Sequence, residues 1–428
     1  MAEPITPPTS TNKPPCRFIY SPADMDQFRA SSARRELLSF ATALGRSCTN
    51  KSSEKGEKIA DYDPSCPLVG LDPGMASLHG SLRAMESWLI DIPPEKSRAR
   101  FGNAAFRKWH ERLTERSAAI VNSILDCHKK HPQPDVSSST NGDSIEAASN
   151  SGFRAAAEGD DASASAKNQE ADQEEKDERK RVVEELTAYL NASFGHPIRI
   201  DYGTGHECSF LVFLYALFRI GCFGPEPGSS SCLRPVALSI FAQYLKVTRG
   251  LQTDYMLEPA GTHGVWGLDD YHCLPFYFGA CQLVNNPRGI SPDSIHDRDI
   301  MAEFHEQYMY FGCIRYIKFL KKGVPFFESS PMLNDISSLP SWTKVSSGLL
   351  RLFEGEVLDK FPVVQHFVFG NIFQATWSPS QKPPTAPERT FINGPFGDEC
   401  IAPWANNSPT DPPSSSAVLP PTRAPWAK

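Results

Sequence analysis

Two short segments of the chain carry the residue types that could do chemistry. The first, RIDYGTGHE, spans residues 199–207, and the second, EPAGTHGVWGLDDYHCLPFYFG, spans residues 258–279. Each sets glycines, carboxylates and aromatic side chains beside a strongly apolar run that is typical of a helix. Glycine lets the backbone approach another group closely, and a carboxylate beside such a turn can hold a cation or orient a ligand. Both segments are therefore candidates for loops that carry function.

The first segment supports two interpretations. Thr204 can cap a following helix, and Glu207, three residues later, can complete a capping box. Alternatively, a glycine turn that opens a helix presents free N–H groups to phosphate, and Arg199 can bind phosphate through two hydrogen bonds. The segment is not a Walker A sequence, because no Lys-Ser or Lys-Thr follows it. It does not begin a zinc-protease motif either, because Phe210 stands where the second histidine would be.

The second segment could form a cleft for a prolyl peptide bond. Rotation about such a bond meets a barrier of about 18–20 kcal/mol, which is set by amide resonance. A cleft that excludes water and holds the bond twisted would lower this barrier without any nucleophile. Candidate lining residues are Trp266, Leu268, Tyr271 and Pro275. In the alternative interpretation, Trp266 and Phe276 are ordinary core residues.

The elements that must position these segments are predicted to be helices. Apolar residues recur at helical spacing along most of the chain, and strand-like alternation is nearly absent. The sequence therefore predicts an all-α fold. The expected helices cover residues 24–44, 78–89, 106–124, 172–194, 210–217, 240–247, 301–320 and 345–353.

Composition divides the chain into five parts. Residues 1–16 are rich in Pro and Thr, residues 131–171 form a low-complexity acidic insertion, and residues 377–428 form a Pro/Ser-rich tail. We expect these three parts to be disordered, because they hold too few large apolar residues to offset the entropy of ordering. The helical parts are then residues 17–130, an N-terminal portion, and residues 172–376, the main domain.

Charge and cysteine content argue against several classes of protein. The net charge is −7, of which residues 141–180 account for −6. No basic face is indicated, which argues against nucleic-acid binding. The longest apolar stretch, residues 210–218, is far shorter than the roughly 20 residues that cross a membrane. Eleven cysteines without a CxxC pair, and no secretory signal, predict reduced thiols and a cytoplasmic location, with the nucleus as an alternative.

Four motifs closely resemble one protein family. They are DYGTGHE, GVWGLDDYHCLPF, YFGCIRYIKFLKKGVPFFESSPMLNDIS and FPVVQHFVFG. Together they resemble the activator of serine/threonine protein phosphatase 2A, also called the phosphotyrosyl phosphatase activator. The resemblance covers residues 197–370 and continues more weakly through residues 78–125. It implies a helical fold with core, linker and lid subdomains around one cleft. It also implies activation of the phosphatase catalytic subunit, with or without its scaffold subunit, and peptidyl-prolyl cis–trans isomerase activity.

The resemblance also implies ligands and residue roles. In the family, ATP is bound by residues that match Arg199, Thr204, Gly205, Gln365, His366 and Phe367. Mg²⁺ is associated with the residues that match Gly264 and Asp270. Trp266 and Asp270 are the expected isomerase residues, with a proline-containing peptide as substrate and a peptide-induced dimer as an expected assembly. The alternative is a non-catalytic assembly chaperone of the phosphatase, whose apparent isomerase activity is peptide binding alone.

Overall fold

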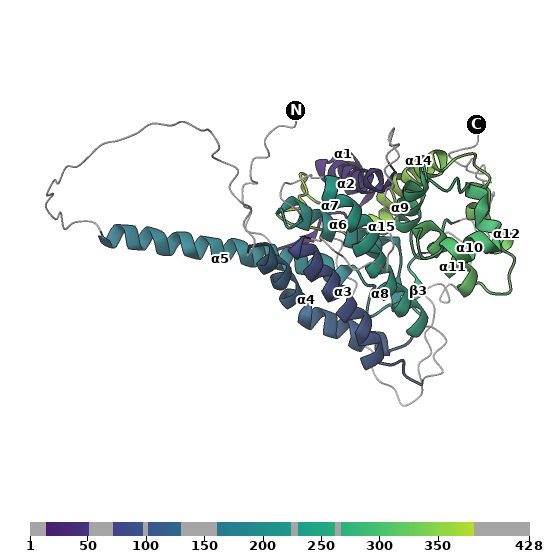
Figure 1. Ribbon diagram of the computed structural model, residues 1–428. Helices are drawn as coiled ribbons and strands as arrows, with labels where there is room; N and C mark the ends of the chain where they lie inside the picture. Colours follow the sequence, from purple (N-terminus) through teal and green to yellow (C-terminus); the bar gives the residue numbers. More distant parts are fainter. Residues whose placement is uncertain are drawn as a thin grey trace, which may run out of the picture. The chain divides into compact units, whose positions relative to one another are not determined.

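The computed structural model of the protein is built almost entirely of helices, which confirms the predicted all-α fold (Figure 1). It describes residues 14–50, 72–96, 102–129, 161–223, 230–261 and 267–380. The elements in chain order are β1 (Cys16–Arg17), α1 (Pro22–Ala30), α2 (Ser32–Cys48), α3 (Pro73–Asp91), α4 (Ala105–Lys129), α5 (Asp161–Ala192), β2 (Asp201–Tyr202), α6 (Thr204–Arg219), α7 (Ser230–Pro235), η1 (Val236–Ile240), α8 (Phe241–Asp254), β3 (Glu258–Pro259), α9 (Leu274–Leu283), η3 (Pro292–His296), α10 (Arg298–Phe304), α11 (Met309–Leu320), α12 (Phe326–Ser329), α13 (Pro331–Ser337), α14 (Trp342–Phe353), η4 (Glu354–Leu358), α15 (Phe361–Val364) and β4 (Val368–Phe369).

Two of the predicted helices are interrupted. The helix expected over residues 24–44 is two helices, because Ser31 is extended and its hydroxyl accepts the N–H of Arg34 to cap α2. The helix expected over residues 301–320 is also two. There the α9 side chain Gln282 accepts the N–H of Met309 and donates to the carbonyl of Gln307, so both backbone groups leave the helical pattern. Local periodicity predicted the helical content but not these breaks.

The structure also corrects three predicted limits. Helix α5 begins at Asp161, inside the segment predicted as a low-complexity insertion, instead of near residue 172. Cys16, predicted to be disordered, pairs with Phe369 in the β1–β4 ladder. Trp377, assigned to the tail, packs its ring against Phe18, Phe28 and Phe369. The ends of the described chain are therefore held together by backbone pairing and aromatic contacts.

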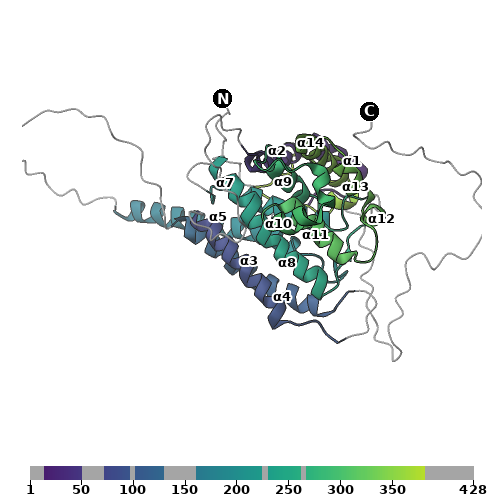
Figure 2. The same ribbon diagram turned by 45° about the vertical axis from the view of Figure 1, so that its right-hand side comes forward.

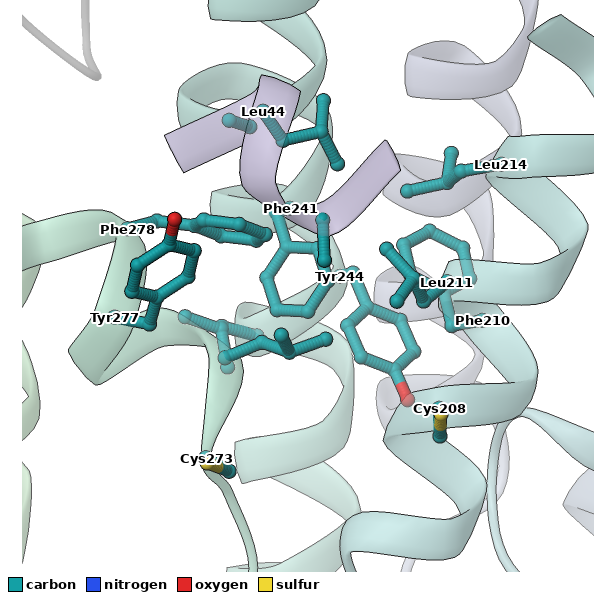
Figure 3. Close-up of a cluster of buried hydrophobic side chains, with 14 of the residues drawn as sticks. Leu44, Cys208, Phe210, Leu211, Leu214, Phe241, Tyr244, Cys273, Tyr277 and Phe278 are labelled. Carbon is teal, nitrogen blue, oxygen red and sulfur yellow. The ribbon is translucent and has the colours of Figure 1, made fainter. Parts of the chain in front are cut away.

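Helix α9 lies at the centre of the packing and contacts α2, α11 and α14. Gly279 makes the α11 contact possible, because a side chain there would collide with the backbone of Tyr310. Beside α9, aromatic side chains of α6 and α8 fill the interior (Figure 3). The rings of Phe210 and Tyr244 stack at 3.9 Å between centroids. This core fixes the position of α6, whose N-terminal end carries the first candidate segment.

Helices α10, α11 and α12 lie together beside α8 and α9 (Figures 1 and 2). Away from them, α3 packs on α4 and α8, and α5 packs on α4 and α6. The two short sheets are antiparallel (β1 with β4) and parallel (β2 with β3). Within the described residues, no helix is long and apolar enough to span a membrane.

Candidate functional site

The first turn of α6 exposes backbone donors. Gly203 is the N-cap residue, and no side chain caps the helix. The N–H groups of Thr204 and Gly205 find no acceptor within the described part of the chain. Gly203 also approaches the neighbouring strand closely, since a Cβ there would lie 3.0 Å from the carbonyl oxygen of Ala260. Free N–H groups together with the helix dipole attract an anion at this end of the helix.

Asp201 contacts both Arg199 and His206 beside this turn. Its Oδ2 accepts a 2.6 Å hydrogen bond from Nε of Arg199, and its Oδ1 lies 3.8 Å from Nε2 of His206. Nδ1 of His206 lies 2.7 Å from the carbonyl of Ala192. Burial alone would raise the pKa of Asp201, but His206 and Arg199 lower it overall. The carboxylate therefore stays ionised and orients the Arg199 guanidinium, whose side chain remains exposed.

Helix α15 brings the C-terminal motif to the same place. Val363 lies 3.6 Å from the position that a Cβ on Gly205 would take. The neighbouring His366 is partly exposed, yet the protein on its inner side removes water from the ring. That desolvation, together with the positive charges of Arg17 and Arg199, lowers the pKa of His366 to about 4. The site therefore brings together the Arg199 guanidinium, the first turn of α6 and the neutral His366 ring from separate parts of the chain.

Glu207 connects α6 to the second candidate segment. The interpretation of this residue as part of a capping box is wrong. Its side chain does not reach back to its own helix. Instead, the buried carboxylate accepts the backbone N–H groups of Cys273 and Leu274 at 2.9 and 3.0 Å, which caps α9. It also lies 3.0 Å from Nδ1 of His272. One carboxylate thus fixes the segment after Asp270 against the first turns of α6.

Asp270 itself faces α11. Its Oδ2 lies 3.1 Å from Nζ of Lys321, which also donates to the carbonyl of Ser329. The preceding Asp269 accepts the N–H groups of Tyr271 and His272, so the turn is held by its own carboxylate. Among the described residues, no three His, Cys, Asp or Glu side chains cluster as a metal site.

A family model decides what kind of protein carries this site. The model of the phosphotyrosyl phosphate activator (PTPA) protein matches residues 15–375. The chain belongs to the PTPA family. The match includes both candidate segments and the FPVVQHFVFG motif, which the fold brings together around α6.

Curated relatives and a solved structure agree with this family. A serine/threonine-protein phosphatase 2A activator 2 of Yarrowia lipolytica is 38% identical over 90% of this chain and 90% of its own length. A probable serine/threonine-protein phosphatase 2A activator 2 of Dictyostelium discoideum is 34% identical over 83% of this chain and 64% of its own length. The crystal structure of the PP2A phosphatase activator Ypa1 matches with a TM-score of 0.62 and 28% identity, over 86% of this chain and 96% of that one.

In this PTPA family member, the residues predicted to bind nucleotide do not all face the same way. Thr204 and Gly205 form the first turn of α6, and Arg199 pairs with Asp201 just before it. Gln365 and His366 follow α15, whose Val363 lies beside Gly205, and Gln365 donates to the carbonyl of Pro362. Phe367 differs, because its ring is buried against Phe28 with 6.0 Å between centroids. Its side chain serves the core. Gly264 and Trp266 lie outside the described residues.

Sequence reasoning missed the residues that assemble the site. Asp201 and His206 stand inside the motif that was singled out, and their types alone could have marked them as partners of Arg199. The pairing of Glu207 with His272 gave no local signal, because the two residues are 65 positions apart and meet only in the fold. Long-range pairs of this kind cannot be read from periodicity, which reports on neighbours three or four residues apart.

Proposed function

We propose that the protein activates the catalytic subunit of protein phosphatase 2A through an ATP–Mg²⁺ site that the two proteins share. Family membership and the names of the relatives support the phosphatase as partner. The proposal that the protein binds a nucleotide rests on one observation. Arg199, the uncapped first turn of α6 and His366 lie in the same region of the fold. Free amides and the Arg199 guanidinium at one helix end suit a triphosphate.

The residues present fit Mg²⁺ only when nucleotide is bound. Asp270 supplies a single carboxylate, and Lys321 now neutralises it at 3.1 Å. Mg²⁺ commonly takes one or two protein carboxylates and completes its octahedron with water and phosphate oxygens. We therefore propose Asp270, with the backbone of Gly264, as the protein ligands, and the phosphates as the main source of the remaining oxygens. The metal would neutralise phosphate charge at the interface.

Reciprocal binding tests this function. If ATP–Mg²⁺ bridges both proteins, it should raise the affinity for the phosphatase catalytic subunit by about 5- to 150-fold, and the phosphatase should raise ATP affinity by the same factor. Both constants can be measured by titration with purified proteins. Asp270→Asn should abolish the gain, while Asp254→Asn, an exposed carboxylate on α8, should preserve it. Equal phosphatase affinity with and without ATP–Mg²⁺ would refute the shared site.

Peptidyl-prolyl isomerisation is a second proposed activity, which would use Trp266 and Asp270. Of the other residues predicted to line its cleft, Leu268 and Pro275 are buried in the core, while Tyr271 is half-buried with its hydroxyl bonded to the carbonyl of Leu257. Leu268 and Pro275 therefore fit the core interpretation better than a cleft lining, and the alternative, a non-catalytic assembly chaperone, needs no such cleft. An isomerase assay of Trp266→Ala beside a phosphatase activation assay separates them. Activation that survives complete loss of turnover would rule out isomerisation as its cause.

A further inference from the structure

A chain of buried hydrogen bonds runs from α6 to α11 through the loop that carries Asp270. Nδ1 of His272 lies 3.0 Å from Oε1 of Glu207, and Nε2 of the same ring lies 3.1 Å from Nε2 of Gln252. Oε1 of Gln252 then accepts a 3.1 Å hydrogen bond from the hydroxyl of Tyr316. We refer to these four residues, Glu207, His272, Gln252 and Tyr316, as the relay. Three of them are buried and the fourth is half-buried.

The Glu207 carboxylate sets the direction of the hydrogen bonds along the relay, beside two longer contacts of 3.4 Å, from the Tyr202 hydroxyl to Nδ1 of His272 and from the Tyr316 hydroxyl to the carbonyl of Arg249. The Glu207 carboxylate also receives two backbone N–H groups, so it acts as an acceptor and Nδ1 of His272 must donate to it. In the neutral ring, Nε2 is then the acceptor, and the Gln252 amide donates to it. The carbonyl oxygen of Gln252 in turn accepts from Tyr316. Burial raises the pKa of Tyr316, which keeps this last donor protonated. The opposite direction would set a bare nitrogen of His272 against a carboxylate.

The loop that carries Asp270 is connected to α11 in two ways, through the buried relay and through the Asp270–Lys321 ion pair at the surface. His272 follows Asp270 by two residues, and its backbone N–H donates to Asp269 at 2.9 Å. At the other end, Tyr316 lies on α11, and Lys321 just beyond that helix pairs with Asp270. A displacement of α11 would therefore strain both the buried relay and the surface ion pair. Through Glu207, the same displacement would reach the first turns of α6.

We propose that His272 is a positioning residue that sets where Asp270 stands relative to the first turn of α6, and that it couples this position to α11 through Gln252 and Tyr316. The consequence for ATP–Mg²⁺ rests on the proposed function. The positional part rests on the hydrogen bonds alone. Position matters because a ligand that bridges two segments gains affinity when they are held in the bound arrangement beforehand.

The tautomer of His272 gives a signature that a purely structural residue need not show. Nuclear magnetic resonance of the full chain, with ¹⁵N-labelled histidine and His272→Gln for assignment, should find the proton of the neutral ring on Nδ1. Gln252→Glu places an acceptor opposite Nε2, so it should move a proton onto that nitrogen and shift its resonance. A wild-type proton on Nε2, or a His272 signal that Gln252→Glu leaves unchanged, would overturn the relay.

Hydrogen exchange tests the coupling to α11. Tyr316→Phe should speed amide exchange over residues 267–274 about fivefold, the effect of losing one hydrogen bond. Tyr310→Phe, on the same helix but outside the relay, should leave exchange there unchanged. Equal effects of the two variants would overturn the proposal. In titrations of the same proteins, the affinity for ATP–Mg²⁺ should be lower for Tyr316→Phe and unchanged for Tyr310→Phe. A wild type that binds no ATP–Mg²⁺ refutes the proposed function, while the exchange result still decides the coupling.

Discussion

At the scale of residues, the candidate site is a balance of charges around one buried carboxylate. Asp201 holds Arg199 by a 2.6 Å hydrogen bond and faces His206, while the charge of Arg199 acts on His366 and His196. Desolvation, followed by the charge of Arg199, lowers the pKa of His196 to about 4. Arg199 and Asp201 balance each other and both imidazoles are neutral at pH 7, so it is the free N–H groups of the first turn of α6 that favour the binding of an anion here.

The lowered pKa of His366 leads to a pH-dependent prediction. In the free protein His366 is neutral at pH 7, because its pKa is about 4. A bound triphosphate would favour the charged ring and raise this pKa, so the complex would hold more protons than the free protein. Affinity for ATP–Mg²⁺ should therefore rise for the wild type relative to His366→Asn as the pH falls from about 7 to about 5. Calorimetric titration of both proteins at each pH measures the difference. Parallel pH profiles would place the phosphates away from His366.

The motifs that resemble the family gave more information about the site than local patterns did. Arg199, Thr204, Gly205 and His366 could be nominated from the sequence, and the fold gathers them around α6. The role of Glu207 could not, because the same letters that spell a capping box are used here to cap α9 instead. Local sequence cannot distinguish a carboxylate that caps its own helix from one that caps another helix, because the backbone N–H groups that bind it come from elsewhere in the chain.

At the scale of elements, the helices were predictable where one face is apolar. The spacing of Leu78, Leu82 and Met85 predicted α3, and all three side chains are buried. The break between α10 and α11 was not predictable, because it depends on Gln282 of α9 capturing two backbone groups. Tertiary hydrogen bonds of this kind override a continuous apolar pattern. They also place α11 so that Lys321 reaches Asp270.

The Lys321–Asp270 ion pair links α11 to the candidate metal ligand, and its removal should change metal affinity. An exposed pair contributes about 0.2–1 kcal/mol, so Lys321→Met should lower the Mg²⁺ concentration needed for ATP binding by up to about fivefold, because Asp270 no longer exchanges an ammonium for the metal. Lys322→Met, the exposed neighbour, is the matched control and should change nothing. Magnesium titrations at fixed ATP measure both. If Lys321→Met needs the same Mg²⁺ concentration for ATP binding as the wild type, Asp270 does not approach the metal.

At the scale of the whole molecule, the two ends of the described chain close over each other next to the site. Strand β1 pairs with β4, which directly follows His366 and Phe367. Trp377 locks this pairing, because its Nε1 donates to the carbonyl of Phe18 at 3.1 Å. Composition placed Trp377 in the tail, since a single aromatic residue in a Pro/Ser-rich stretch gives no periodic signal. Only the fold shows that its ring packs against aromatic residues far away in the sequence.

Loss of this closure should therefore reduce both stability and ligand affinity. Trp377→Ala removes a half-buried ring from Phe18, Phe28 and Phe369, and should cost about 2 kcal/mol of unfolding free energy, roughly half the figure for a fully buried aromatic residue. Because β1 also carries Arg17, whose charge reaches His366, ATP–Mg²⁺ should bind more weakly. Trp377→Phe keeps a ring but loses the hydrogen bond to Phe18, so denaturant titration should place it between the wild type and Trp377→Ala. If both variants have the same unfolding free energy as the wild type, the ends of the described chain contribute no stability. If Trp377→Ala loses stability but keeps its affinity for ATP–Mg²⁺, β1 does not shape the site.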